Sequence, residues 1–187
     1  MIAHSFAWVK QSARARTFWA SAALAVLTMI ALQVVGAPLK TTASPAGIVS
    51  FELAGSFANS ERMLAAWDPL TRLYAGVDLG LDYLFIVTYV VAIGLGCTLV
   101  AERLTARAPV FAAIGVTLAW AMLVAGVLDS VENYALLRLL FGAQENAMAM
   151  VARYCAIPKF AIVAMGLLYL IVGATLPQRR ATPATRA

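Results

Sequence analysis

The stretch PVFAAIGVTLAWAMLVAGVLDSVENY, residues 109–134, decides how the chain folds. Residues 109–128 carry no charge and are long enough to cross a bilayer as a helix. Asp129, Glu132 and Asn133 follow directly. Acidic side chains at that depth are costly unless they are paired, hydrated or protonated, so they mark a candidate functional site.

The composition outside this stretch is also that of a membrane protein. Of the 187 residues, 63% are hydrophobic and only 12% are charged, which is too apolar for a soluble domain. Four long apolar runs occur, and each must satisfy its own backbone hydrogen bonds in lipid. We therefore predict an all-α, polytopic membrane protein, with a bundle of four transmembrane helices in one domain. The predicted spans cover residues 18–36, 77–101, 109–134 and 150–176.

The first apolar run has a second interpretation. A basic segment precedes it and Ala37 follows it, as in a secretory signal with a cleavage site. Its apolar core is longer than that of a typical signal peptide, so we interpret residues 18–36 as a retained span.

The longest connection, residues 37–76, joins the first two spans. Pro38 and Gly47 interrupt it early, and apolar and polar residues are mixed after that. This pattern predicts one or two short amphipathic helices outside the membrane, lying on its surface or over the mouth of the bundle. Asp68 and Pro69 are typical of a helix start, so the second long helix could begin there. A connection of this length is usually functional, for example as a lid.

The basic residues predict the orientation. They account for the net charge of +5, and because they lie beside the spans, topology explains them better than a nucleic-acid partner does. They gather in the amino-terminal segment, in the 102–108 turn and in the tail 178–187, which we expect to be disordered. The positive-inside rule then predicts that both termini are cytoplasmic and that the 37–76 loop is periplasmic, in the inner membrane of a Gram-negative-like cell. The basic residues concerned are Lys10, Arg14, Arg16, Arg103, Arg107, Arg179, Arg180 and Arg186.

Several kinds of chemistry are excluded or unsupported. His4 is the only histidine, which excludes a histidine-ligated zinc or iron site and a haem held by two histidines. Cys97 and Cys155 are expected in opposite halves of the bilayer, too far apart for a disulfide. The motifs GxSxG, CxxC, HExxH, GxGxxG and the P-loop are absent. We predict no metal site and no cofactor, and the sequence favours a protein that is not an enzyme.

Polar residues from three spans are expected at one depth of the bundle. In the predicted topology they lie near the outer ends of the second and third spans and a third of the way along the fourth, beneath the long loop. The candidate ligand or proton site comprises Asp82, Asp129, Glu132, Lys159, Asp78, Asn133 and Glu52. The side chains that could line its wall are Tyr83, Tyr89, Trp120 and Tyr134. We expect Lys159 within salt-bridge reach of Asp82, Asp129 or Glu132, because an ammonium group facing hydrocarbon is costly.

Alternatives remain at this point. The acids could be solvated at the membrane interface, and Lys159 could snorkel or merely fix the helix packing. If they are buried, the excess of acids over one lysine requires a protonated acid, pairing with arginines or a bound cation.

The predicted function is to bind or handle a small amphipathic ligand, a lipid head group or a proton, with membrane lipid or a lipid-like molecule as the partner. The alternative is a non-catalytic accessory or assembly subunit of a larger membrane complex. An intramembrane enzyme ranks third.

Overall fold

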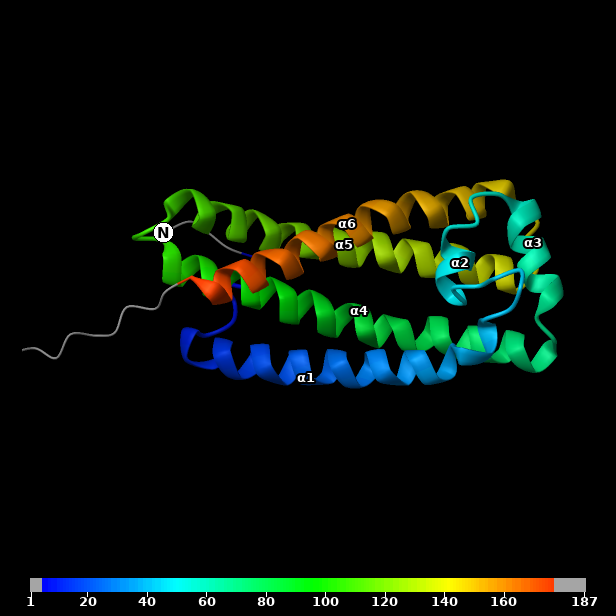
Figure 1. Cartoon of the computed structure of the whole chain (residues 1–187), viewed down its shortest axis with the longest axis horizontal. Coiled ribbons are helices and arrows are strands. Elements are labelled where there is room, and N and C mark those ends of the chain that lie inside the picture. Colours follow the sequence, from blue (N-terminus) through cyan, green and yellow to red (C-terminus); the bar gives the residue numbers. More distant parts are fainter. Residues whose placement is uncertain (1–4, 177–187) are drawn as a thin grey trace, which may run out of the picture.

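The computed structural model describes residues 5–176, which form helices joined by short segments, without strands (Figure 1). Four of the helices are long and apolar enough to cross a membrane. The predicted all-α fold with a bundle of four apolar helices is therefore confirmed. The four are α1 (Gln11–Val35), α4 (Pro69–Leu104), α5 (Pro109–Leu140) and α6 (Asn146–Thr175). His4 and the tail 178–187, which we expected to be disordered, lie outside the described residues.

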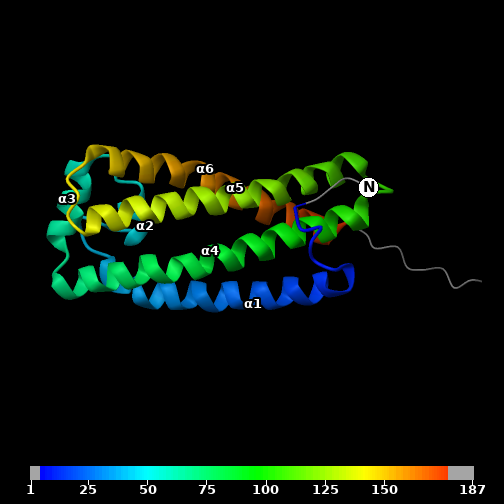
Figure 2. The same ribbon diagram turned by 180° about the vertical axis from the view of Figure 1, so that it is seen from behind.

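The long helices run up and down, and α4 is the central one. It packs along α1 on one side and along α5 on the other, and α5 packs along α6 (Figures 1 and 2). The contact between α4 and α6 is smaller, and α1 and α6 are not a packed pair among the described helices. Helix α4 begins as the sequence predicts, because the side chain of Asp68 accepts a hydrogen bond of 2.7 Å from the backbone N–H of Thr71.

The two ends of the bundle differ, and we name them by what lies there. The lid end carries residues 37–67, the lid segment, and the terminal end carries the start of α1, the α4–α5 turn and the end of α6 (Figure 1). The helices of the lid segment are η1 (Ala37–Leu39), α2 (Ile48–Glu52) and α3 (Phe57–Ala66).

The lid segment is packed onto the bundle by apolar side chains. Leu39, Phe51 and Trp67 are almost fully buried, and they pack against small side chains of α5 and α6 such as Ala135 and Ala149. The indole N–H of Trp67 donates a hydrogen bond of 3.1 Å to the carbonyl oxygen of Leu39. The prediction that short amphipathic helices cover the mouth of the bundle is therefore confirmed.

At the terminal end, residues before α1 fold back into the bundle, which the sequence analysis did not predict. The ring of Phe6 is buried against Gly94 of α4. The hydroxyl of Ser5 donates a hydrogen bond of 3.0 Å to the carbonyl oxygen of Ala119 in α5. Arg14 forms an ion pair with Glu102 nearby.

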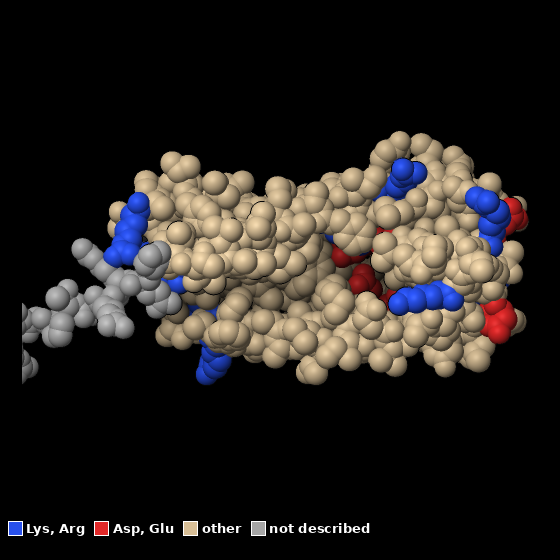
Figure 3. Space-filling model, viewed as in Figure 1, with Lys and Arg blue, Asp and Glu red and all other residues tan. Residues whose placement is uncertain are grey.

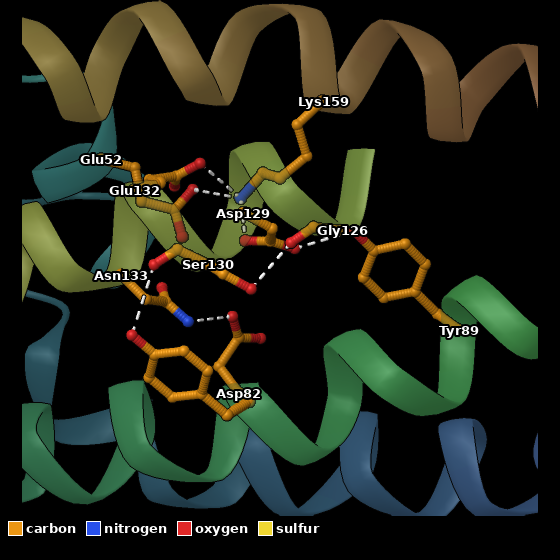
Figure 4. A network of polar contacts seen from close by, with 10 residues as sticks. Glu52, Asp82, Tyr89, Gly126, Asp129, Ser130, Glu132, Asn133 and Lys159 are labelled. Carbon is orange, nitrogen blue, oxygen red and sulfur yellow. Dashed lines mark hydrogen bonds and ion pairs between the residues drawn. The ribbon is translucent and has the colours of Figure 1, made fainter. Parts of the chain in front are cut away.

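Glycines bring α6 against α4 in the half of the bundle toward the terminal end. A Cβ atom on Gly166 would lie 2.7 Å from Ile93, and one on Gly173 would lie 2.5 Å from Val100. Apolar side chains, including Met122, fill the core at this level. Toward the lid end, polar side chains lie between α4 and α6 instead (Figure 4).

Candidate functional site

A buried lysine lies at the centre of the polar cluster. The Nζ atom of Lys159 on α6 is 2.9 Å from Oδ1 of Asp129 and 2.8 Å from Oε2 of Glu132, both on α5 (Figure 4). It is also 3.9 Å from Oε2 of Glu52, which belongs to α2 of the lid segment. The expected ion pair of Lys159 with Asp129 or Glu132 is therefore confirmed.

The polar residues around Lys159 are buried and are not exposed to solvent at the membrane interface. Asp129 is 3% exposed and Glu132 is 0% exposed, so the alternative that these two acids are solvated is wrong. The reason is their spacing, since residues three apart share one face of a helix, and this face of α5 is turned toward α4 and α6. Neither does Lys159 snorkel, because it is only 5% exposed.

A second set of contacts joins α4 to the same face of α5. The hydroxyl of Tyr89 donates a hydrogen bond of 2.9 Å to Oδ2 of Asp129. The side-chain amide of Asn133 donates one of 2.7 Å to Oδ2 of Asp82, which is half-buried. The hydroxyl of Tyr83 donates to the carbonyl oxygen of Ser130 at 3.3 Å. Six of the seven candidate site residues thus fall into two contact groups, one around Lys159 with Glu52, Asp129 and Glu132, and one formed by Asp82 and Asn133.

Asp78 is the exception. Its side chain is 3% exposed and lies beside Gly36, at the end of α1. It has no hydrogen-bond or ion-pair partner among residues 5–176. The structure therefore buries Asp78 near enough to Glu52 for their charges to interact, but no hydrogen bond or ion pair joins Asp78 to the other candidate residues within the described part of the chain.

The cluster holds more acceptor oxygens than its donors satisfy. Within the part of the chain that the structure describes, Oε1 of Glu132 is buried without a hydrogen-bond partner, and so is Oε2 of Glu52. Oε2 of Glu132 is close to Lys159, but the geometry of that ion pair is not that of a hydrogen bond. No arginine pairs with these carboxyl groups within the described part of the chain. Because buried acceptors are normally satisfied, these oxygens can accept a further hydrogen bond, either from a proton that one of the acids holds or from a cationic group.

Glu52 is the acid that the lid segment contributes to this site. Burial raises the pKa of its carboxyl group above the ordinary value of 4.5, the charge of Lys159 lowers it, and the charge of Asp129 raises it again. Burial is the largest of these effects. The carboxyl group of Glu52 therefore holds its proton to a higher pH than a free glutamate does.

The prediction that four aromatic side chains line the wall of the site is wrong for two of them. Tyr83 and Tyr89 do contact the polar cluster, but Trp120 is 49% exposed and Tyr134 is 54% exposed on the outside of α5. At about 100° per residue, positions 120 and 134 lie about 180° and 140° around the helix from Asp129. Tyr134 instead lines a shallow apolar groove of about 500 Å³ on the outer surface between α4 and α5.

The cluster is reached from the side of the bundle. Figure 3 shows a hollow next to the lid segment, with acidic atoms at its floor. Comparison with the ribbon in the same view places this hollow between α6 and α4, beside α2. Since glycine contacts join α4 and α6 closer to the terminal end, the hollow is confined to the part of the bundle next to the lid segment. The acids therefore lie in a site that opens sideways.

Basic side chains flank α2 beside this hollow. Lys40 lies against Gly47, at the start of α2, and Arg153 of α6 lies against Gly55, just after it. Both basic side chains are exposed. No local sequence pattern indicates that Lys40 and Arg153 lie here, because the fold of the lid segment brings them to α2.

No group of histidine, cysteine, aspartate and glutamate side chains within residues 5–176 is arranged to hold a metal ion. The divalent-cation alternative therefore has no structural support. Comparisons of the chain with protein-family models, with curated proteins and with solved structures give no match.

Proposed function

We propose that the chain is a multi-pass inner-membrane protein that binds the cationic group of a small amphipathic ligand, or a proton, in the hollow beside the lid segment. One observation carries this proposal. The carboxyl groups of Glu52, Asp129 and Glu132 surround a single ammonium group, and Oε1 of Glu132 has no hydrogen-bond partner among residues 5–176. An unpartnered acceptor in a buried site is costly, and a bound donor removes that cost.

The surroundings favour binding over conduction through the bundle. Beyond Tyr89, toward the terminal end, the core consists of apolar side chains such as Val90, Ile93 and Met122. The ring of Phe6 fills the space next to Gly94 in the same region. A proton or ligand would therefore enter and leave at the side of the bundle next to the lid segment.

The proposed orientation is that the terminal end lies in the cytoplasm and the lid segment in the periplasm. The support is the basic character of the terminal end, where Arg14, Arg16, Arg103 and Arg107 lie close to the ends of the spans. The hollow would then face the periplasmic leaflet, and the apolar part of a ligand would extend from it into the lipid.

The test is native mass spectrometry of the full chain purified in a mild detergent. We expect the wild-type protein to retain an amphipathic molecule and Glu132→Gln to lose most of it. Glu61→Gln on the exposed side of α3 is the matched control and should retain it.

If no amphiphile is retained, infrared spectroscopy should detect a buried protonated carboxyl group in the wild-type protein that is lost in Glu132→Gln. The proposal is wrong if neither signal depends on Glu132. Stoichiometric co-elution with another membrane protein, without either signal, would favour the accessory-subunit alternative.

A further inference from the structure

The two carboxyl groups with unpartnered oxygens lie together. Oε2 of Glu132 and Oε2 of Glu52 lie 2.8 Å and 3.9 Å from the same Nζ atom of Lys159, and Figure 4 shows the two carboxyl groups next to each other. Glu132 is 0% exposed and Glu52 is 8% exposed, although they come from α5 and from the lid segment. Two buried carboxyl groups beside each other favour a shared donor between them.

We propose that this pair receives the primary ammonium group of an amphiphile whose anionic group lies nearby, between Lys40 and Arg153. This inference rests on the proposed function and specifies its ligand. A primary ammonium group has N–H donors that can reach oxygens of Glu52 and Glu132 at once. A quaternary ammonium group has none, and its usual site is a cage of aromatic side chains. The acceptors here are carboxylate oxygens, so the chemistry selects an ammonium group with N–H donors.

The position of the basic side chains defines the second part of the ligand. Lys40 and Arg153 flank α2, which carries Glu52 (Figure 3 shows basic side chains around this part of the surface). Arg153 precedes Lys159 on α6, so it lies about 9 Å closer to the lid end. A phosphate next to the ammonium group would therefore meet positive charge at the rim of the hollow, while the ammonium group meets the acids at its floor.

The side opening accounts for the amphiphilic character of the ligand. The hollow lies between two apolar helices rather than at the end of the bundle (Figures 1 and 3). Acyl chains attached to the head group could therefore stay in the lipid while the head group occupies the hollow. The same chemistry, an ammonium group next to a phosphate, is also that of free phosphoethanolamine, and the experiment distinguishes these two sources.

The experiment is a titration of the detergent-purified full chain, followed by native mass spectrometry and by the thermal unfolding midpoint. The probes are phosphatidylethanolamine, phosphatidylcholine and phosphatidylglycerol with the same short acyl chains, and free phosphoethanolamine. We expect phosphatidylethanolamine to bind at least about tenfold more tightly than phosphatidylcholine, a difference of about 1.4 kcal/mol. If phosphoethanolamine binds equally well, the acyl chains contribute nothing, which would overturn the amphiphile and leave the ammonium and phosphate groups as the recognised chemistry.

Variants connect this preference to the site. Glu132→Gln and Glu52→Gln should both remove the preference for phosphatidylethanolamine, and Arg153→Gln should weaken binding of both phosphoethanolamine compounds. Glu52→Gln changes only the lid segment, which makes it informative even if Glu132→Gln folds poorly. Glu61→Gln should behave like the wild-type protein.

Equal binding of phosphatidylcholine that still depends on Glu132 would overturn this inference and leave the proposed function standing. If no amphiphile binds in a way that depends on Glu132, the inference is wrong, and so is the proposal that the protein binds an amphiphile. The infrared measurement then decides whether the site binds a proton.

Discussion

The ammonium group of Lys159 lies 2.9 Å from the carboxyl group of Asp129, across the interface of α6 and α5. Tyr89 of α4 holds the other oxygen of Asp129, at 2.9 Å. One carboxyl group thus connects three of the four long helices. Removing any member of this contact should therefore affect how the helices pack and what the site can bind.

Lys159→Met should destabilise the protein more than Lys159→Met combined with Asp129→Asn. The single change leaves Asp129 and Glu132 buried without their counter-charge, which typically costs about 3–5 kcal/mol. The double change removes one of the orphaned charges, so part of that cost should be regained. The free energy of unfolding, measured in one detergent for both variants, decides this. Lys40→Met, at an exposed lysine, is the control and should change the free energy of unfolding by less than about 0.5 kcal/mol. If the effects of Lys159→Met and Asp129→Asn on the free energy of unfolding simply add, the two side chains do not stabilise each other as a buried ion pair.

The stability of the ligand-free protein should decrease as the pH rises above about 5, and Glu52→Gln should reduce this decrease. Folding raises the pKa of Glu52 above 4.5, so the protonated carboxyl group favours the folded state. Its contribution is complete below that ordinary pKa and is lost as the pH rises through the raised value. The titratable and charged groups that face Glu52 are unchanged in this variant, namely Asp78, Asp82, Asp129, Glu132 and Lys159.

The measurement is the thermal unfolding midpoint in detergent at a series of pH values from about 5 to 8, compared between the wild-type protein and Glu52→Gln. Glu61→Gln should follow the wild-type curve, because Glu61 is exposed. A wild-type protein whose stability increases over this range, with a flat curve for Glu52→Gln, would show that the carboxylate form of Glu52 favours folding instead.

The depth of the polar residues could be predicted from the sequence, but their direction around the helix could not. Hydropathy locates the spans, because a helix in lipid must be apolar and must satisfy its own backbone. Antiparallel spans then bring Asp129 of α5 and Lys159 of α6 to one level. Depth alone does not show which face of a helix is buried, and for that reason the prediction that Trp120 and Tyr134 line the wall of the site is wrong. Once the inward direction of Asp129 is known, the helical period places both on the outside.

The contacts of the lid segment and of the amino-terminal segment were harder to predict. The amphipathic pattern of residues 37–67 indicates that they cover a surface, but not that Glu52 would reach Lys159. Likewise, Phe6 lies in a short segment without periodicity, and its burial depends on a distant glycine. Such contacts are tertiary, so no local pattern encodes them.

Cysteine labelling should place the lid segment in the periplasm and the α4–α5 turn in the cytoplasm. Thr42→Cys and Ala106→Cys are suitable positions because both residues are exposed, in the lid segment and in the α4–α5 turn respectively. The background replaces Cys97 and Cys155 by alanine. In intact cells a membrane-impermeant reagent should label Thr42→Cys and should label Ala106→Cys only after the membrane is permeabilised. The opposite pattern would reverse the proposed orientation, and equal labelling of both would contradict the four-span topology.

Gly94→Ala should destabilise the protein by about 1–3 kcal/mol, although alanine is the better helix former. A Cβ atom on Gly94 would overlap the ring of Phe6, which is 1% exposed and enclosed by the bundle, so the ring would have to leave its site. Gly80→Ala in the same helix is the matched control, because no atom lies within 4 Å of its Cβ position, and it should be neutral or stabilising by up to about 1 kcal/mol. In a Phe6→Ala background the ring is gone, and Gly94→Ala should then cost little. Thermal unfolding of the four variants in one detergent measures this coupling, and a Gly94→Ala protein as stable as Gly80→Ala would mean that Phe6 does not occupy this site in the folded protein.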